Sequence, residues 1–312
     1  MAEHIPVLLK PVVAAFDRDL AVAPVVDGTC GLGGHSAALL DAIDGLRIVG
    51  LDRDKQSVAV ATDALARFGG RAVVRHGTFG GWLEQLHSVG VDRGAGLLLD
   101  LGVSSPQLDQ PGRGFSFRHD GPLDMRMDDS DGPTALEFLR TSTEADIADV
   151  IFRYGEERLS RRIARGITKA LGENRLSTTA QLAEICRRAY PPGPQRIDPA
   201  TRTFQALRIA INDEIGELER ALAACPAGIA APGVVAVISF HSLEDRVVKQ
   251  TMQAWATQEL GRILKPWPVT ADDAERASNP RARSAKLRVF LWGDQGPHKD
   301  PRDKYRSKKH RT

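Results

Sequence analysis

Residues 25–36 read VVDGTCGLGGHS, an apolar run that ends in Asp27 and leads through a glycine-rich turn into a helical segment. Glycines in such a turn adopt backbone angles that other residues avoid, and they let a ligand approach the main chain closely. The spacing is Gly31-x-Gly33-x-x-Ser36, which departs from the dinucleotide fingerprint G-x-G-x-x-G at its last position. The stretch therefore predicts a strand, a ligand-binding turn and a helix.

Outward from this stretch, the first hundred residues alternate between strands and helices. Strands are predicted at 22–27, 47–51, 71–75 and 95–99, and helices at 35–43, 57–68 and 81–88. This rhythm is typical of βαβ units around a parallel sheet. The sequence therefore predicts an α/β fold with a doubly wound, mostly parallel sheet.

The alternation breaks after Asp100. Residues 102–133 are rich in Gly, Pro, Ser and Asp, and so long a loop in a compact domain is usually functional. Helices are then predicted at 135–139, 144–152, 157–171, 179–190 and 202–224, followed by an apolar strand at 233–239. The simplest organisation is a discontinuous sheet domain at 1–104 and 201–295, an inserted all-helical substrate-recognition domain at 105–200, and a basic tail at 296–312, which we expect to be disordered.

Length and composition fit a globular chain in a reducing compartment. The 312 residues, 42% of them hydrophobic, suffice for one large domain or two ordinary ones. The three cysteines, an odd count at irregular spacing, argue against a disulfide framework or a metal site and favour a cytoplasmic location. No signal-peptide segment or membrane-spanning stretch is predicted, so we expect no membrane partner.

Charge is unevenly distributed along the chain. The 42 Lys and Arg against 40 Asp and Glu give a net charge of +2, which taken alone argues against a nucleic-acid partner. Residues 298–312, however, hold seven Lys or Arg against two Asp. The predicted helix at 157–171 also carries a basic face, formed by Arg158, Arg161, Arg162, Arg165 and Lys169. Both segments can contact phosphates, although each is equally consistent with a solvated surface.

Three carboxylates follow the predicted strands and indicate the kind of ligand. Asp27, Asp52 and Asp100 each end a strand, and parallel strands bring such ends to one crevice. Asp52, 19 residues beyond Gly33, is placed to accept both ribose hydroxyls of a nucleoside. Three acids suit a cationic ligand better than a pyrophosphate, which favours S-adenosylmethionine over NAD. Any one of them alone could equally be an ordinary strand-end or helix-cap residue.

Longer motifs across the chain carry a family resemblance. They are DGTCGLGGHS at 27–36, DLGVSSPQ at 100–107, RGFSF at 113–117, GPLDMRM at 121–127, YGEE at 154–157, PATRTFQA at 199–206, SFHSLEDR at 239–246 and NPRARS at 279–284. Together they closely resemble the bacterial ribosomal RNA small subunit methyltransferase H family, also called MraW. Two features depart from the family pattern: Asp198 stands where His is more usual, and the basic tail is longer.

The resemblance implies a Rossmann-like class I methyltransferase that transfers a methyl group from S-adenosylmethionine to cytosine N4 in the decoding region of 16S rRNA. It also implies 16S rRNA or the small ribosomal subunit as partner, with a monomer or a homodimer expected. The cofactor residues carried over from the family are Gly33, Gly34 and His35 at the methionine end, Asp52 at the ribose, Phe79 at the adenine, and Asp100 and Gln107 completing the pocket.

The group that accepts a hydrogen bond from the target amine is the least determined part of the site. The loop after the fourth strand, which contains Ser104 and Ser105, is placed for this role, and we predict Ser105 or a nearby backbone carbonyl. Three alternatives remain open: a methyltransferase of the same fold acting on another RNA or on a protein, a non-catalytic RNA-binding ribosome-assembly factor, and an NAD-dependent dehydrogenase. Ser36 in place of the last glycine disfavours the dehydrogenase.

Overall fold

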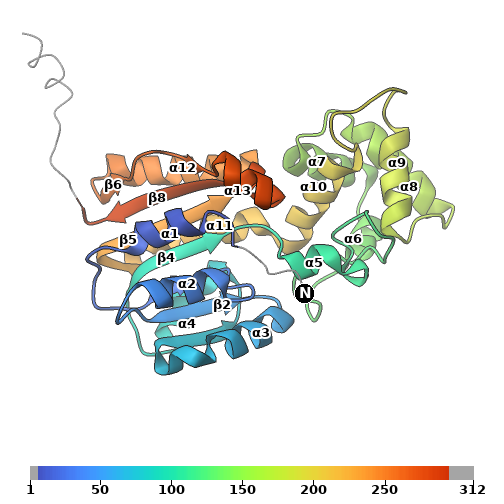
Figure 1. Ribbon diagram of the computed structural model, residues 1–312. Helices are drawn as coiled ribbons and strands as arrows, with labels where there is room; N and C mark the ends of the chain where they lie inside the picture. The colour runs from blue at the N-terminus through green and yellow to red at the C-terminus, as the bar shows by residue number, and fades with distance from the viewer. Residues whose placement is uncertain (1–5, 295–312) are drawn as a thin grey trace, which may run out of the picture.

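The computed structural model describes residues 6–294, so the predicted basic tail at 296–312 lies outside the described residues. Its centre is a sheet of eight strands (Figure 1). They are β1 (Val25–Asp27), β2 (Ile48–Asp52), β3 (Ala72–His76), β4 (Gly94–Asp100), β5 (Ile229–Ser239), β6 (Gly261–Ile263), β7 (Val269–Thr270) and β8 (Lys286–Trp292). The order is β3-β2-β1-β4-β5-β8-β6, and β7 pairs with β8. Strands β1 to β5 are parallel, whereas β8 is antiparallel to β5, so the predicted doubly wound, mostly parallel sheet is confirmed.

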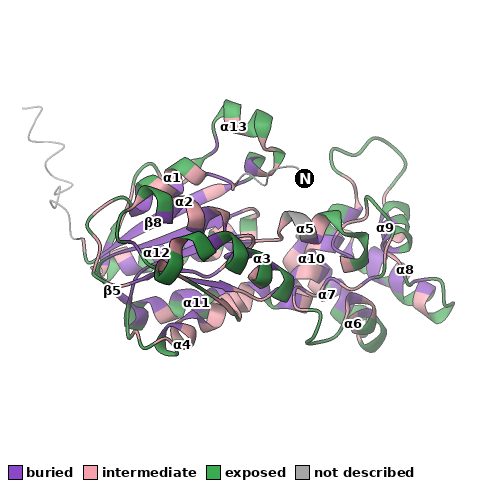
Figure 2. Ribbon diagram, turned by 60° about the horizontal axis from the view of Figure 1, so that its bottom comes forward, coloured by how far each residue is buried: buried purple, intermediate pink, exposed green. Residues whose placement is uncertain are grey.

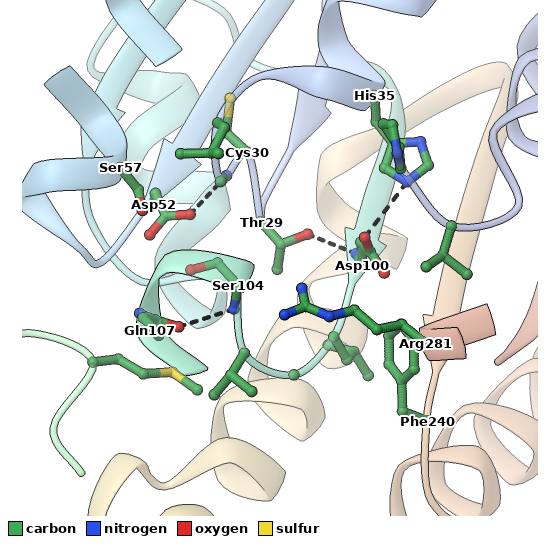
Figure 3. A pocket seen from close by; sticks show the side chains of 18 of the residues that line it. Thr29, Cys30, His35, Asp52, Ser57, Asp100, Ser104, Gln107, Phe240 and Arg281 are labelled. Carbon is green, nitrogen blue, oxygen red and sulfur yellow. Dashed lines mark hydrogen bonds and ion pairs between the residues drawn. The ribbon is translucent and has the colours of Figure 1, made fainter. Parts of the chain in front are cut away.

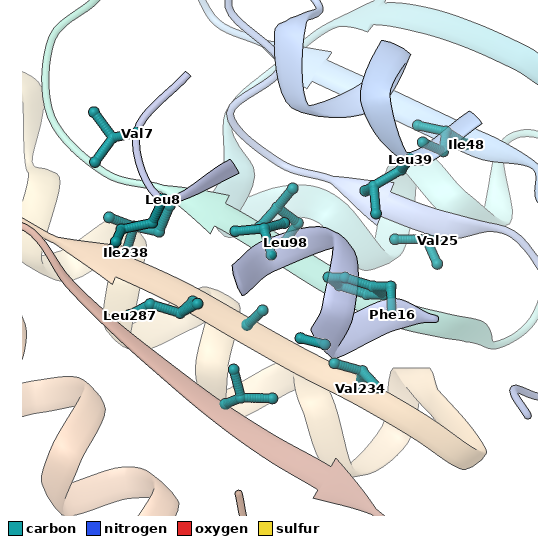
Figure 4. Packing of buried hydrophobic residues seen from close by; sticks show 14 of the residues in the cluster. Val7, Leu8, Phe16, Val25, Leu39, Ile48, Leu98, Val234, Ile238 and Leu287 are labelled. Atoms are coloured by element: carbon teal, nitrogen blue, oxygen red, sulfur yellow. The ribbon is translucent and has the colours of Figure 1, made fainter. Parts of the chain in front are cut away.

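Helices cover both faces of this sheet and bury it. The helices around the sheet are α1 (Leu9–Phe16), α2 (Gly34–Ala42), α3 (Lys55–Leu65), α4 (Trp82–His87), α11 (Glu214–Gly228), α12 (Ser242–Thr257) and α13 (Asp273–Ser278). Alternate residues of β4 enter different cores: Leu98 packs with Phe16 and Leu39 on one face (Figure 4), and Leu97 with Trp82 and the α11 side chains on the other. Burial on both faces explains why β4 is a continuous apolar run.

A second group of helices lies beside the sheet (Figure 1). It comprises α5 (Ser105–Asp109), α6 (Ala135–Thr141), α7 (Glu144–Gly155), α8 (Ser160–Gly172), α9 (Thr179–Arg188) and α10 (Ala200–Asn212). This helical unit has a hydrophobic cluster of its own, built around Ile147, Ile163 and Leu182, while the outer faces of its helices are exposed (Figure 2). Met125 and Leu123 from the long loop are buried in the same cluster, so the loop packs as part of the unit.

The structure differs from the sequence expectation at several points, since α1, α12, α13, β6 and β7 were not predicted. The single helix predicted at 202–224 is two helices, because Asp213 adopts a left-handed conformation with φ of 48° between α10 and α11. Strand β8 was not predicted, since the charged Arg288 interrupts its apolar pattern. Arg288 is nevertheless buried, because its guanidinium donates to both carboxylate oxygens of Asp245 at 2.8 and 3.1 Å.

The predicted division into domains stays a prediction, with one refinement. Phe204 and Leu207 of α10 belong to the hydrophobic cluster of the helical unit, so we propose that the inserted unit extends from residue 105 through α10. Between residues 6 and 294, no helix has both the length and the apolar character needed to span a membrane.

Candidate functional site

A cavity of about 350 Å³ opens at the carboxyl ends of the parallel strands, between the sheet and the helical unit (Figure 3). The turn after β1 and the ends of β2 and β4 supply Thr29, Asp52 and Asp100 to its wall. The helical unit and the loop before it contribute Arg208 and Met127. In open α/β sheets this edge is where ligands bind, because the crossovers diverge there.

The glycine-rich turn holds the chain close to the sheet. A Cβ atom at Gly28 would lie 2.7 Å from Leu99 and 2.9 Å from Phe79, so this position has no room for a side chain. Gly31, with φ of 55°, occupies the left-handed region that glycine tolerates at little cost. The main chain of the turn therefore forms part of the cavity wall, and no side chain at Gly28 or Gly31 covers it.

Asp27 was expected to face the same crevice as Asp52 and Asp100, and this prediction is wrong. It does not line the cavity but is buried behind the turn, where its carboxylate accepts a 2.6 Å hydrogen bond from Ser36 Oγ and one of 3.3 Å from the Thr29 backbone. Burial raises the pKa of Asp27, although these hydrogen bonds oppose the rise. Asp27 therefore fastens the turn to the start of α2 and does not face a ligand.

Two of the three residues predicted at the methionine end line the cavity. Gly34 and His35, in the first turn of α2, are part of its wall. Gly33 is not among the lining residues, and an added Cβ at this position would lie 3.3 Å from Leu65. Its φ of 85° makes it the bend into α2, and any contact of Gly33 with a ligand would have to come from its main chain.

Asp52 ends β2 with its carboxylate anchored by the main chain. Its Oδ2 accepts a hydrogen bond from the Gly31 backbone at 2.8 Å, and its Oδ1 accepts one from the Asp54 backbone at the same distance. Burial raises the pKa of Asp52 to about 6, since the desolvation of the charge outweighs these two hydrogen bonds. A carboxylate held in this way still has lone pairs for two further donors.

Asp100 ends β4 at the centre of the cavity. Its backbone N–H donates to Thr29 Oγ1 at 2.6 Å, and its Oδ2 lies 3.5 Å from His35 Nε2 (Figure 3). Burial lowers the pKa of His35, but the adjacent Asp100 carboxylate outweighs burial, and the net shift is upward. His35 and Asp100 therefore lie side by side as an interacting pair on the cavity wall.

Several polar atoms of the cavity wall are buried without a hydrogen-bond partner among the described residues. They are Asp100 Oδ1, Ser104 Oγ and His35 Nδ1, while His35 Nε2 has only its 3.5 Å ion-pair contact with Asp100. Buried polar atoms in folded proteins are almost always paired. Their concentration here indicates a wall that is completed by a polar, charged ligand.

Gln107 and Phe79 both line the cavity, as predicted. Gln107 is buried, its Oε1 accepting from the Ser104 backbone at 3.0 Å and its Nε2 donating to Asp54 Oδ2 at 3.1 Å. The same Asp54 oxygen pairs with Arg113 Nη1 at 2.9 Å. Asp54 and Arg113 were missed from sequence, and the signal that could have found Arg113 is its place at the head of the RGFSF motif.

Ser105 begins α5 directly after the cavity-lining Ser104. Its side chain lies outside what the structure describes, so the catalytic role of Ser105 stays a prediction. Arg53, Ser57, Phe240 and Arg281 also line the cavity and were not predicted as site residues. Spacing could not identify them, because they come from four separate elements of the chain.

The class of protein is a Rossmann-like methyltransferase, as defined by the sheet order, the glycine-rich turn and the acid at the end of β2. The Asp100 carboxylate oxygen that lacks a partner in the described part of the chain suits the ammonium group of the methyl donor.

Comparison with known proteins identifies the family. The model of the MraW methylase family matches residues 1–291, so the chain belongs to that family, as its motifs suggested. The chain is similar to ribosomal RNA small subunit methyltransferase H of Sorangium cellulosum, with 51% identity over 290 residues that cover 92% of this chain and 90% of that protein. It is also similar to the proteins of the same name from Rhodospirillum centenum, 50% identical with 91% of each chain covered, and Methylobacterium nodulans, 46% identical with 93% and 90% covered. The predicted cofactor, S-adenosylmethionine, is confirmed by this membership.

Proposed function

We propose that this protein methylates N4 of a cytosine in the decoding region of 16S rRNA. Membership of the MraW methylase family supports methylation of small-subunit rRNA. The observation that supports the finer statement is the extent of the cavity, which continues past Asp100 to Phe240 and Arg208, so that a methyl donor and a planar base can meet in it.

For the cofactor, we propose the residue roles that the family resemblance implies. Asp52 accepts the ribose hydroxyls, Phe79 packs against the adenine, and Asp100 with Gln107 completes the pocket. Gly33, Gly34 and His35 hold the methionine end, with Gly33 acting through its main chain. The unpaired atoms of Asp100 and His35 fit this assignment, because the methionine moiety carries both an ammonium and a carboxylate.

The chemistry needs positioning more than strong acid or base. When bound, S-adenosylmethionine supplies an electrophilic methyl group on a sulfonium. The cytosine amine is a weak nucleophile because its lone pair is delocalised into the ring, so the protein has to hold it in line with that methyl group. We propose that Ser105, or a backbone carbonyl of its loop, accepts an N4–H hydrogen bond as positive charge develops on the nitrogen.

A base can reach this cavity only after it has left its stack, so the rRNA has to be gripped outside it. Arg158, Arg161, Arg162, Arg165 and Lys169 are all exposed at the start of α8 and along it. The opposite side of α8 is buried through Ile163 and Ile167. We propose that this basic face contacts rRNA phosphates, together with the tail at 296–312. The protein would then act in the cytoplasm, with a monomer or homodimer as the expected state.

The decisive experiment is mass mapping of 16S rRNA nucleosides after small subunits from a strain lacking this enzyme are incubated with protein and labelled S-adenosylmethionine. We expect one N4-methylcytosine in the decoding region. A label on another RNA or on a protein would support a different methyltransferase, and no label at all would support a non-catalytic assembly factor. Titration calorimetry with S-adenosylmethionine and NAD provides the parallel test, because a preference for NAD would refute the cofactor itself.

A further inference from the structure

The cavity wall continues beyond the residues assigned to the cofactor. Asp52, at the end of β2, lies on the side of the cavity opposite Phe240 in Figure 3. Phe240 directly follows β5, and Arg281 lies in the short 3-10 helix Pro280–Arg283 that precedes β8. The part of the wall around Phe240 and Arg281 is therefore built from the carboxyl-terminal third of the chain.

Arg281 is held rigidly at this place. Its backbone N–H donates to Asn279 Oδ1 at 3.2 Å, and its neighbour Ala282 is buried in the sheet core. From this anchor the Arg281 side chain reaches across the cavity toward Asp100 and Ser104 (Figure 3). The Arg281 guanidinium thus lies near the centre of the cavity and enters it from the side opposite Asp52, the proposed ribose-binding residue.

The surroundings of Arg281 favour a neutral, planar partner. Burial lowers the pKa of Arg281, although the carboxylates of Asp109 and Asp100 oppose this shift, and Arg118 adds a second positive charge nearby. The start of α2, which includes His35, already offers the cofactor carboxylate main-chain N–H groups and an imidazole. Beside Arg281 the wall offers the flat, apolar ring of Phe240, which suits a nucleobase.

We propose that Arg281 is a base-positioning residue that recognises the target cytosine, donating to ring N3 and O2 while the ring lies near Phe240. Arginine presents paired donors in one plane, which matches two adjacent acceptors. Cytosine has acceptors at both positions, whereas uracil carries a hydrogen on N3, so the contact selects cytosine. In this orientation the N4 amine, adjacent to N3, points toward Asp100 and the methyl group. The inference rests on the proposed function and adds a specificity residue to it.

The test compares three variants of the full-length protein on unmodified small subunits. Arg281→Ala should lower kcat/KM for methyl transfer about 10- to 100-fold, the usual effect of losing a bidentate base contact. Arg281→Lys should recover only a minor part, because an ammonium is a point charge. Arg283→Ala, an exposed position two residues away, removes the same charge and should stay within about threefold of the wild type. Affinity for S-adenosylmethionine, measured by calorimetry, should be unchanged in all three.

An atomic substitution on the RNA makes the test specific. Subunits reconstituted with 3-deazacytidine at the target position lack the N3 acceptor, so we expect Arg281→Ala to cost no more than about threefold on them. The same large loss on both substrates would overturn the N3 contact. If Arg281→Ala loses as much affinity for S-adenosylmethionine as it loses activity, Arg281 binds the cofactor carboxylate and the inference is overturned. If Arg283→Ala lowers activity as much as Arg281→Ala does, the effect of Arg281 is one of general positive charge, which also overturns the inference.

The two proposals fail in different ways. If the wild-type protein forms no N4-methylcytosine, the proposed function is refuted and the role of Arg281 with it. If the wild type is active and Arg281→Ala matches it, only the role of Arg281 is refuted.

Discussion

The acids that end β1 and β2 differ in their pKa shifts from acids of the helical unit. At the sheet edge, burial raises the pKa of Asp27 and Asp52, and one oxygen of Asp100 has no partner among the described residues. In the helical unit, hydrogen bonds and nearby arginines lower the pKa of the acids, as for Asp146 in its helix cap and Asp198 beside Arg187. The helical unit satisfies its own charges, whereas the sheet edge keeps charges that a ligand has to satisfy.

The largest effect that would test this contrast is expected from Asp52→Ala. Removing the carboxylate leaves buried ribose hydroxyls without an acceptor, which should weaken S-adenosylmethionine binding about 100-fold or more. Calorimetry on the purified protein measures it. Asp41→Ala, an exposed acid on α2, serves as the control and should bind normally. Unchanged affinity in Asp52→Ala would remove this residue from the cofactor site.

In the helical unit, the substitution to compare with Asp52→Ala is Asn212→Ala, which should lower stability. Asn212 is buried at the end of α10, where its side chain accepts from the Met127 backbone and donates to the Met125 carbonyl, both at 2.8 Å. Since the variant leaves these buried groups unpaired, we expect the free energy of unfolding to fall by about 2–4 kcal/mol. Urea denaturation measures the loss, and a decrease under about 0.5 kcal/mol would show that the loop is held by other contacts.

The pH dependence of cofactor binding gives a third comparison. The folded pKa of Asp52, about 6, lies above its ordinary value of 3.8, so the folded apo protein takes up a proton between these values and loses stability as pH rises through the window. Ribose hydroxyls need the ionised carboxylate as an acceptor. Affinity for S-adenosylmethionine should therefore fall by up to tenfold per unit as pH drops below about 6.

The control for this pH effect is Asp52→Asn, which removes the titrating group. Its weaker binding should not change over that window of pH. A wild-type affinity that stays constant between pH 5 and pH 7, both about one unit from the folded pKa, would contradict the assignment of Asp52.

The smallest effect on stability is expected at a helix cap of the helical unit, the amino-terminal end of α9. Thr178 caps α9 reciprocally with Gln181, forming a capping box. Thr178→Ala should cost about 1 kcal/mol, or about 2 °C in Tm, with no change in cofactor affinity. Thermal unfolding with and without S-adenosylmethionine checks both statements, because a loss of affinity would mean that the two regions are coupled more tightly than their separate hydrophobic clusters indicate.

Local sequence patterns predicted most of the residues at the edge formed by β1, β2 and β4, but not the cavity residues that later parts of the chain supply. The turn, Asp52 and Asp100 were found because a strand, a bend and an acid follow one another within a few residues. Phe240 and Arg281 were not found as site residues, since the pairing of β5 with β4 and of β8 with β5 brings them to the cavity. The break at Asp213 was missed for a related reason, because the residues on both sides of it form a continuous helical pattern.

Ser36 has a consequence for how this family can change over evolutionary time. In dinucleotide-binding proteins the corresponding position is a third glycine, but here the Ser36 hydroxyl is the short hydrogen-bond partner of the buried Asp27. A mutation to glycine would leave a buried carboxylate without its strongest partner, at a cost of about 1–3 kcal/mol. A lineage cannot drift from one turn to the other one residue at a time without passing through a less stable intermediate. The serine and the aspartate therefore act as one unit, because replacing either one leaves the other without this hydrogen bond.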